Sequence, residues 1–261
     1  MVKKIITWAY TVLIFCFLYA PIAVLMAMSF NESQYNALPF KFSTKWYALL
    51  AENTKLIDAT VHSLYIAAIT GAICVILGTA LMLGVIEVRP KIKALINSLV
   101  VLPLTIPWLI MGLSLLLLLR ALGLERNFVI LLIGHVIISL PYAVLVIAAR
   151  MQDMDRSIQE ASYSLGANDW VTFVRITLPI IFPAMLSGGF IAFMISFDNF
   201  VISYFLIPTG NTTLPIEIYS SIKFGFTPEI NAISTIMLSI SLIIILFIAG
   251  SMRSSIKSLF K

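Results

Sequence analysis

Charged side chains are scarce in this chain. Asp, Glu, Lys and Arg together make up 11% of its 261 residues, whereas they make up about a quarter of a typical soluble domain. Hydrophobic residues make up 61% of the chain. A soluble domain cannot be this apolar, so we expect the chain to fold within a membrane.

Cysteine is almost absent as well. The two cysteines, Cys16 and Cys74, both lie inside apolar segments. We expect each to be a small buried residue, and the sequence indicates neither a disulfide nor a metal site.

Long apolar segments fill most of the sequence. A bilayer core of about 30 Å requires about 20 apolar residues per helix. Six segments qualify, at about 5–30, 57–86, 94–120, 128–150, 180–207 and 230–252. The first is longer than a signal-peptide core, which favours an uncleaved anchor. In the third, Pro103 and Pro107 predict a bend. The fold class expected is all-α, a polytopic membrane protein with six transmembrane helices.

Lysine and arginine predict the orientation of these helices. With both termini on one side, 11 of the 17 Lys and Arg residues fall on that side. Because cytoplasmic loops are enriched in Lys and Arg, we expect both termini to be cytoplasmic. The net charge of +5 is then an orientation signal, and we expect no nucleic-acid partner.

The loop at about 152–175 is patterned although it is too short to span a membrane. Glu160 lies in a predicted helix that Gly166 can end by adopting a left-handed conformation. Asn168 or Asp169 can cap a second short helix, which we expect to stop at Pro179. The prediction is a helix–turn–helix on the cytoplasmic surface.

An aspartate, Asp198, interrupts the fifth apolar segment. A carboxylate at the centre of a membrane helix costs roughly 2.5–3.5 kcal/mol and normally faces a pathway or a partner. Ser196, Asn199 and Ser203 recur at helical spacing, which predicts one polar stripe with Asp198 on its flank. These side chains would attract a cation. Simple exposure of Asp198 at the membrane interface is the alternative.

Trp46 lies in the first outer loop, in a predicted helix at 43–50 that Ser43 or Thr44 would cap. Its ring can lie at the level of the lipid headgroups. Alternatively, the ring can lie at the outer mouth of a pathway and contact a cation there.

The patterned loop resembles the permease subunits of bacterial ATP-binding-cassette (ABC) importers. Their signature is Glu-Ala-Ala, three residues, Gly, nine residues and Ile-x-Leu-Pro, and it corresponds here to Glu160-Ala161-Ser162, Gly166 and 176–179. Ser162 in place of the second alanine is the only departure. The resemblance covers roughly 57–252 and implies a type I ABC importer permease fold. It also implies that Glu160, Ala161, Ser162, Gly166 and Ala167 couple the chain to an ATPase subunit.

The segment 196–203, with 213–215 and 228–232, resembles the spermidine/putrescine permeases of these importers. This resemblance implies a bacterial inner-membrane location, a polyamine substrate and contact with membrane lipid. It also implies three kinds of protein partner: a second homologous permease subunit, two ATP-binding cassette subunits and an external substrate-binding protein. Asp198, Asn199, Ser196 and Trp46 would lie on the substrate pathway, or Asp198 would pair with the second permease.

The domains expected on this basis follow the apolar segments. Residues 1–56 would form the first transmembrane helix and an outer loop. Residues 57–252 would form the ABC transmembrane type-1 core with its coupling helix, and 253–261 a short cytoplasmic tail.

A phosphate-binding Gly-x-x-x-x-Gly-Lys-Ser/Thr loop is missing from the sequence. We therefore expect that the chain is not an enzyme and binds no cofactor, and that the partner ATPase binds ATP and Mg²⁺. Three alternatives stay open. The first is an ABC permease for ferric ion, thiamine or phosphonate. The second is a secondary transporter that uses Asp198 as a proton or sodium site. The third is an intramembrane serine protease built on Ser114 and His135.

Overall fold

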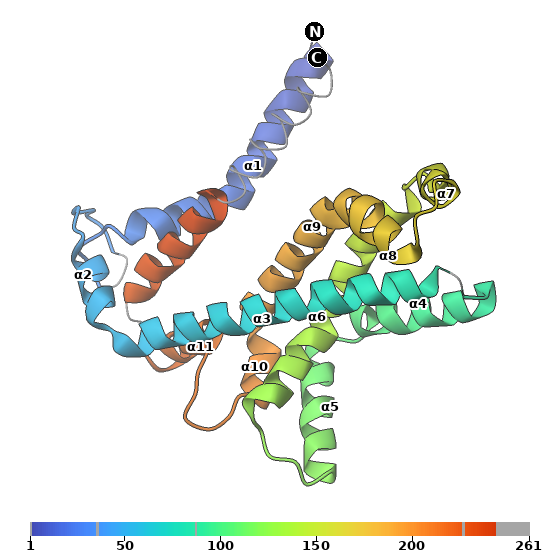
Figure 1. Cartoon of the computed structure of the whole chain (residues 1–261). Helices are drawn as coiled ribbons and strands as arrows, with labels where there is room; N and C mark the ends of the chain where they lie inside the picture. Colours follow the sequence, from blue (N-terminus) through green and yellow to red (C-terminus); the bar gives the residue numbers. More distant parts are fainter. Residues whose placement is uncertain (1, 35–36, 87, 226–227, 244–261) are drawn as a thin grey trace. The chain divides into compact units, whose positions relative to one another are not determined.

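The structure is a computed structural model that describes residues 2–34, 37–86, 88–225 and 228–243 (Figure 1). These residues contain no strand, only an isolated antiparallel bridge between Asn31 and Phe42. The helices are α1 (Val2–Met28), α2 (Lys45–Glu52), α3 (Thr54–Val85), α4 (Pro90–Thr105), α5 (Trp108–Ala121), α6 (Phe128–Gln152), α7 (Arg156–Ser164), α8 (Asp169–Thr172), a π-helical segment (Phe173–Thr177), α9 (Leu178–Phe197), α10 (Phe200–Leu206), α11 (Leu214–Phe224) and an apolar helix, Glu229–Ile243.

The all-α membrane fold expected from the sequence is confirmed, but a count of six transmembrane helices is not. Four helices in the described residues are long and apolar enough to cross a membrane: Ile6–Met28, Thr54–Val85, Phe128–Gln152 and Asp169–Phe197. A fifth span requires α4 and α5 to be counted together. Of the segment expected at 230–252, the structure describes Glu229–Ile243, and the remainder lies outside the described residues.

The predicted bend in the third segment is confirmed. α4 and α5 meet at an angle of 104°. α4 ends at Thr105, and Ile106 is extended with φ −93° and ψ 126°. Proline disfavours the helical conformation in the residue before it, so Pro107 forces Ile106 out of the helix. Pro107 then precedes the first residue of α5.

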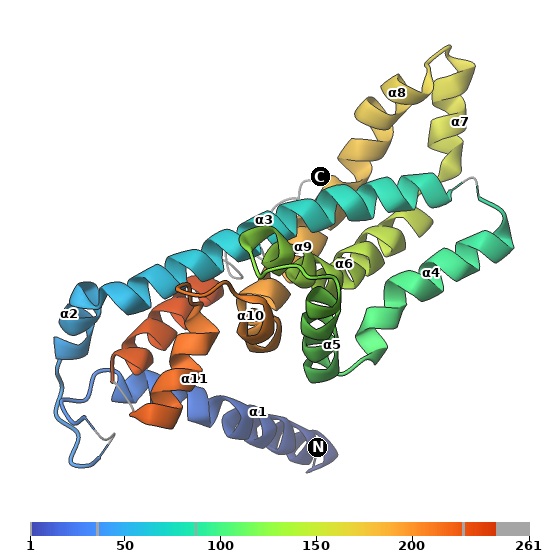
Figure 2. The ribbon, with the colours of Figure 1, turned by 90° about the horizontal axis from the view of Figure 1, so that it is seen from below.

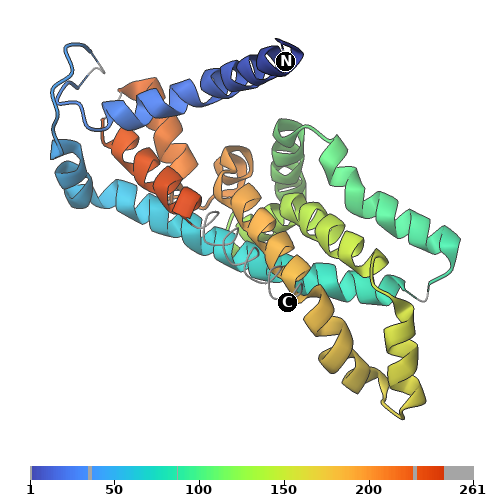
Figure 3. The ribbon, with the colours of Figure 1, turned by 90° about the horizontal axis from the view of Figure 1, so that it is seen from above.

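The chain divides into two compact units, which we describe separately: Met1–Ile57 with Ile218–Lys261, and Asp58–Glu217. In the second unit α6 and α9 pack along each other, and α3 contacts both of them (Figures 2 and 3). Their backbones approach closely at glycines. A Cβ atom on Gly71 would lie 2.9 Å from the carbonyl oxygen of Gly189, and one on Gly188 would lie 3.1 Å from that of Ala143. Small residues of this kind let membrane helices pack without a gap.

Candidate functional site

The fifth apolar segment is broken at Asp198. α9 ends at Phe197, and α10 begins at Phe200. Asn199 is extended with φ −79° and ψ 96°, and its side-chain oxygen accepts a hydrogen bond of 2.7 Å from the N–H of Ile202. This is an N-cap, which starts a new helix. The expectation of one polar stripe along a continuous helix is therefore wrong.

A buried histidine holds both sides of this break. Nδ1 of His135, on α6, lies 2.8 Å from Oγ of Ser196, and Nε2 lies 3.2 Å from Oγ of Ser203. Ser196 is on α9 and Ser203 is on α10, and all three side chains are buried. A neutral imidazole has one donor and one acceptor nitrogen, so it can bond both hydroxyls at once. His135 thereby ties α9 and α10 to α6.

These contacts bear on the roles expected for three residues. Ser196 is buried and its hydroxyl faces His135, so its expected place on the pathway stays a prediction. Both ring nitrogens of His135 are engaged, which leaves neither to activate Ser114, and Ser114 itself is exposed. The constellation expected for an intramembrane protease is thus not formed.

Asp198 differs from its neighbours because its side chain is exposed. Asn199 beside it is only 1% exposed. Among the residues that the structure describes, no ion pair to Asp198 is found. The break therefore turns one carboxylate out of the bundle and keeps its polar neighbours inside.

Three aromatic rings are stacked along α9 in the segment that precedes Asp198. The rings of Phe190 and Phe193 are stacked with centroids 6.3 Å apart, and those of Phe193 and Phe197 are stacked with centroids 6.0 Å apart. Aromatic faces are electron-rich and attract cations. An exposed carboxylate suits a cation better than an anion.

Trp46 is buried inside its own loop. Its side chain is 6% exposed, its Nε1–H donates to the carbonyl oxygen of Asn31 over 2.7 Å, and Nζ of Lys45 lies 4.3 Å from its ring centroid. The buried ring is not free to contact a cation in this structure, and the position of Trp46 at the headgroup level or at the mouth of a pathway stays a prediction. The predicted helix is confirmed as α2: Thr44 precedes it without a side-chain capping bond, and Oγ of Ser43 accepts the N–H of Lys45 over 3.2 Å.

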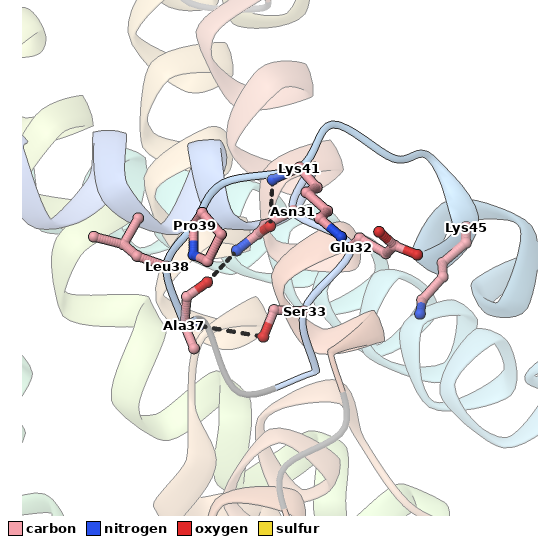
Figure 4. A pocket seen from close by; sticks show the side chains of 8 residues that line it. All are labelled: Asn31, Glu32, Ser33, Ala37, Leu38, Pro39, Lys41 and Lys45. Carbon is pink, nitrogen blue, oxygen red and sulfur yellow. Dashed lines mark hydrogen bonds between the residues drawn. The ribbon is translucent and has the colours of Figure 1, made fainter.

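Asn31 is the residue that closes this loop (Figure 4). Its Nδ2 donates to the carbonyl oxygen of Ala37 over 2.9 Å, and its Oδ1 accepts from the backbone N–H of Lys41 over 3.0 Å. The loop borders an open hollow of about 430 Å³ that Glu32 and Lys45 help to line. Trp46 packs inside the loop and bonds the backbone of Asn31, which lines the hollow.

The loop after α6 forms the predicted helix–turn–helix. Asp155 caps α7 by accepting the N–H of Ser157 over 2.9 Å, and this contact lowers the pKa of its carboxyl. α7 ends in a Schellman motif, in which Gly166 donates to the carbonyl of Tyr163 and Ala167 donates to the carbonyl of Ser162. Gly166 has φ +84°, the left-handed conformation expected from the sequence.

The second helix begins as expected and ends differently. Asn168 caps it by accepting the N–H of Val171 over 2.9 Å. The helix does not stop at Pro179, because α8 continues through Phe173–Thr177 into α9. A proline ring normally clashes with the carbonyl four residues earlier. That carbonyl belongs to Arg175, inside the π-helical segment, whose wider turn relieves the clash.

Side-chain hydrogen bonds connect the two halves of the helix–turn–helix. Oγ of Ser162 lies 2.9 Å from Oγ1 of Thr172, and Nε2 of Gln159 donates to Oγ1 of Thr177 over 2.9 Å. The hydroxyl by which Ser162 departs from the importer signature is thus a link between α7 and α8.

The tip of the helix–turn–helix is polar in part and apolar in part. Glu160, Ala161 and Gly166 are exposed, whereas Ala167 is half-buried. Leu165 is 89% exposed and Trp170 is 70% exposed. The tip therefore exposes two large apolar side chains beside polar ones.

Solved structures share this fold. A bacterial ABC transporter that imports the acidic polysaccharide alginate superposes with a TM-score of 0.69 at 14% identity, over 96% of this chain and 95% of that one. The MetNI methionine ABC transporter, in an inward-facing form, superposes with a TM-score of 0.62 at 14% identity, over 77% of this chain and 95% of that one. The expected type I ABC importer permease fold is confirmed.

Sequence relatives cover almost the whole chain. The spermidine/putrescine transport system permease protein PotC of Escherichia coli K12 is 32% identical over 94% of this chain and 93% of its own length. The putrescine transport system permease protein PotI of the same organism is 38% identical over 88% of this chain and 85% of its own length. Residues 76–258 match a family of transport proteins. The chain belongs to that family, the inner membrane components of binding-protein-dependent transport systems.

Proposed function

We propose that this chain is the permease subunit of an ATP-driven importer of polyamines, with spermidine and putrescine as its substrates. The observation that carries the proposal is the similarity of nearly the whole chain to two polyamine permeases. The exposed carboxylate at the break between α9 and α10 is consistent with a polycationic cargo.

Asp198 is the side chain that meets the substrate in this proposal. An ammonium group that leaves water for the membrane interior loses hydration, and a nearby carboxylate offsets that loss more strongly there than in bulk water. The stacked rings of Phe193 and Phe197 offer a further attractive surface. Asn199 and Ser196 act indirectly, since their bonds fix the turn that presents Asp198.

Energy for transport comes from a separate ATPase, which binds ATP and Mg²⁺. We assign Glu160, Ala161, Ser162, Gly166 and Ala167 to the surface that docks on it, with exposed Leu165 and Trp170 as apolar anchors. The complete importer contains a second permease, two ATPase subunits and an external binding protein. Both termini of this chain face the cytoplasm.

A continuous helix connects the two sites. The helix Asp169–Phe197 has 29 residues, so it is about 44 Å long at 1.5 Å per residue. One end carries the α7–α8 joint and the other ends at Asp198. Movement of the docked joint would therefore displace the carboxylate directly, and the substrate would be exposed first to one side of the membrane and then to the other.

Uptake of radiolabelled spermidine and putrescine tests the proposal. Cells that lack this chain are complemented with the wild type, with Asp198→Asn, or with Asp198→Glu, which keeps the charge. Glu125→Gln is the matched control, because it removes an exposed carboxylate from the loop before α6. We expect uptake to be lost without the chain, restored by the wild type and by Glu125→Gln, reduced at least tenfold by Asp198→Asn, and partly restored by Asp198→Glu.

Two results would limit the proposal in different ways. Uptake that does not depend on the chain, in cells without another polyamine importer, would contradict polyamines as the substrate. It would not affect the family assignment. Full uptake by Asp198→Asn, with normal amounts of protein in the membrane, would contradict the role of Asp198 in the pathway. It would not contradict polyamines as the substrate.

A further inference from the structure

A small pocket lies where the ends of four helices meet in the unit Asp58–Glu217. Its volume is about 190 Å³. Met82 of α3, Lys93 of α4, Met151 and Gln152 of α6, and Arg156 and Gln159 of α7 help to line it. Neither the substrate pathway nor the docking surface proposed above accounts for this pocket.

The pocket is basic. Lys93 and Arg156 both line it, and no acidic side chain does. The structure shows no ion pair for either cation within the residues it describes. The carboxylate closest to them in sequence, Asp155, accepts the backbone N–H of Ser157. Two cations that share a pocket without a counterion repel each other, so an anion bound between them would be stabilised.

The remaining lining groups fit a phosphate. Gln152 and Gln159 bring amide N–H donors, and Nε2 of Gln159 uses one of its hydrogens on Thr177. Lys and Arg side chains with additional N–H donors are the usual partners of phosphate oxygens. Met82 and Met151 give the pocket an apolar side, which suits a phosphate that is attached to hydrocarbon.

The pocket also lies at the right depth for a lipid headgroup. α3 has 32 residues and α6 has 25, which correspond to about 48 Å and 38 Å, both longer than the hydrocarbon core of about 30 Å. Met82 and Met151 lie within four residues of the ends of these helices. Because both helices extend beyond the hydrocarbon core, we expect the pocket to lie at headgroup level, on the side of α7. Basic pockets between transmembrane helices on the cytoplasmic side are typical sites for anionic headgroups.

We propose that this pocket binds a phosphate group, supplied by the headgroup of an anionic phospholipid. Arg156 and Gln159 belong to α7, whereas Lys93 and Gln152 belong to α4 and α6. A bound phosphate therefore joins the first turns of the coupling helix to the ends of two membrane helices. The inference does not depend on which cargo the importer carries.

Native mass spectrometry of the full-length chain, purified with its accompanying subunits in nonionic detergent, tests the site. The probes are phosphatidylglycerol, phosphatidylcholine and inorganic phosphate. The test variant is Lys93→Gln with Arg156→Gln. The control is Arg89→Gln with Lys91→Gln, which removes two cations from the same region without touching the pocket. We expect the test variant to bind phosphatidylglycerol roughly tenfold or more weakly, while the control binds it like the wild type.

Each outcome decides the proposal. Preference for phosphatidylglycerol over phosphatidylcholine, lost only in the test variant, supports it. Equal loss of phosphatidylglycerol binding in the test and control variants indicates a general attraction between anionic lipid and basic side chains, and overturns the proposed site. If the pocket binds inorganic phosphate and not phosphatidylglycerol, the proposal that a lipid supplies the phosphate group is overturned. If the test variant does not fold, the melting temperature of the wild type is measured with each lipid. A rise with phosphatidylglycerol but not with phosphatidylcholine supports the proposal, and any other result overturns it.

Discussion

His135 is a buried polar residue whose contacts are complete. Its two ring nitrogens meet Ser196 and Ser203, seven residues apart in sequence and on opposite sides of a helix break. A helix break in a membrane leaves backbone groups without their regular partners, so it persists only where other groups hold it. At this break Asn199 bonds the backbone of α10, and His135 bonds the side chains on both sides.

Replacing His135 tests whether it positions the break. We expect His135→Ala to lower the free energy of unfolding by about 1–3 kcal/mol, because two membrane hydrogen bonds are lost and a cavity is left. His135→Gln should recover part of this loss, since an amide both donates and accepts. The melting temperature in detergent measures stability, and the KM of uptake reports the position of Asp198.

A purely structural role would affect these two readouts differently. If His135 positions Asp198, the KM for uptake rises in His135→Ala and falls back toward the wild-type value in His135→Gln. A lower melting temperature with an unchanged KM in both variants would mean that the break keeps its shape without the histidine.

At the scale of elements, the joint between α7 and α8 depends on one glycine. Gly166 has φ +84°, and a Cβ atom there would meet nothing within 4 Å. The cost of Gly166→Ala is therefore conformational alone, about 1–2 kcal/mol. We expect the joint to open roughly 5 to 30 times more often, as faster hydrogen exchange at residues 162–167, and substrate-stimulated ATP hydrolysis to fall.

Gly84→Ala is the matched control for this prediction. A Cβ atom on Gly84 also meets nothing within 4 Å, but Gly84 lies in helix α3 with an ordinary backbone conformation. Alanine is favoured over glycine in a helix, so we expect this change to be neutral or slightly stabilising. Equal effects of the two substitutions on hydrogen exchange in the joint would refute the role given to the left-handed residue.

The N-cap of α7 makes this helix sensitive to acid. The Ser157 N–H and hydroxyl hold the pKa of Asp155 below its usual range. A carboxyl with a lowered pKa stabilises the folded state above its ordinary pKa and loses that contribution as pH falls through the folded value. We expect hydrogen exchange in Arg156–Ser164, corrected for its intrinsic rate, to accelerate below about pH 4. Asp155→Asn keeps a capping side chain and should show a weaker acceleration at low pH. The same acceleration in this variant as in the wild type would show that the Asp155 cap is not its cause.

Local chemistry made several elements predictable from the sequence. Pro107 forces its neighbour out of a helix, Gly166 accepts a left-handed conformation, and Asn168 caps whatever helix follows it. The break at Asn199 was missed because apolar residues on both sides suggested one continuous helix. The signal was present, since Asn199 has the same capping preference as Asn168.

Contacts between distant residues explain what the sequence could not predict. The burial of Trp46 depends on Asn31, fifteen residues earlier, which turns the loop back on itself. The contact of His135 with Ser196 spans 61 residues. No pattern within a single helix indicates either contact. The continuation of the helix through Pro179 was not predicted either. It depends on the π-helical segment before the proline, which no pattern in the sequence indicated.

At the scale of the whole molecule, the orientation in the membrane follows from charge alone and stays a prediction. Of the 17 Lys and Arg residues, 11 fall on the side expected to be cytoplasmic. That side carries α7, and a docking surface for an ATPase can function only where ATP is present. Reversing the orientation would also place the basic pocket at the outer leaflet.

Labelling of single cysteines in spheroplasts tests the orientation. Cys16 and Cys74 are replaced by alanine, and a cysteine is introduced at Glu125 or at Asp153, both exposed and on opposite predicted sides. We expect a membrane-impermeant maleimide to label Glu125→Cys in intact spheroplasts and Asp153→Cys only after permeabilisation. A cytoplasmic thiol protein that stays unlabelled shows that the spheroplasts are intact. Labelling of Asp153→Cys under those conditions would invert the topology, and the α7–α8 surface could then not dock on a cytoplasmic ATPase.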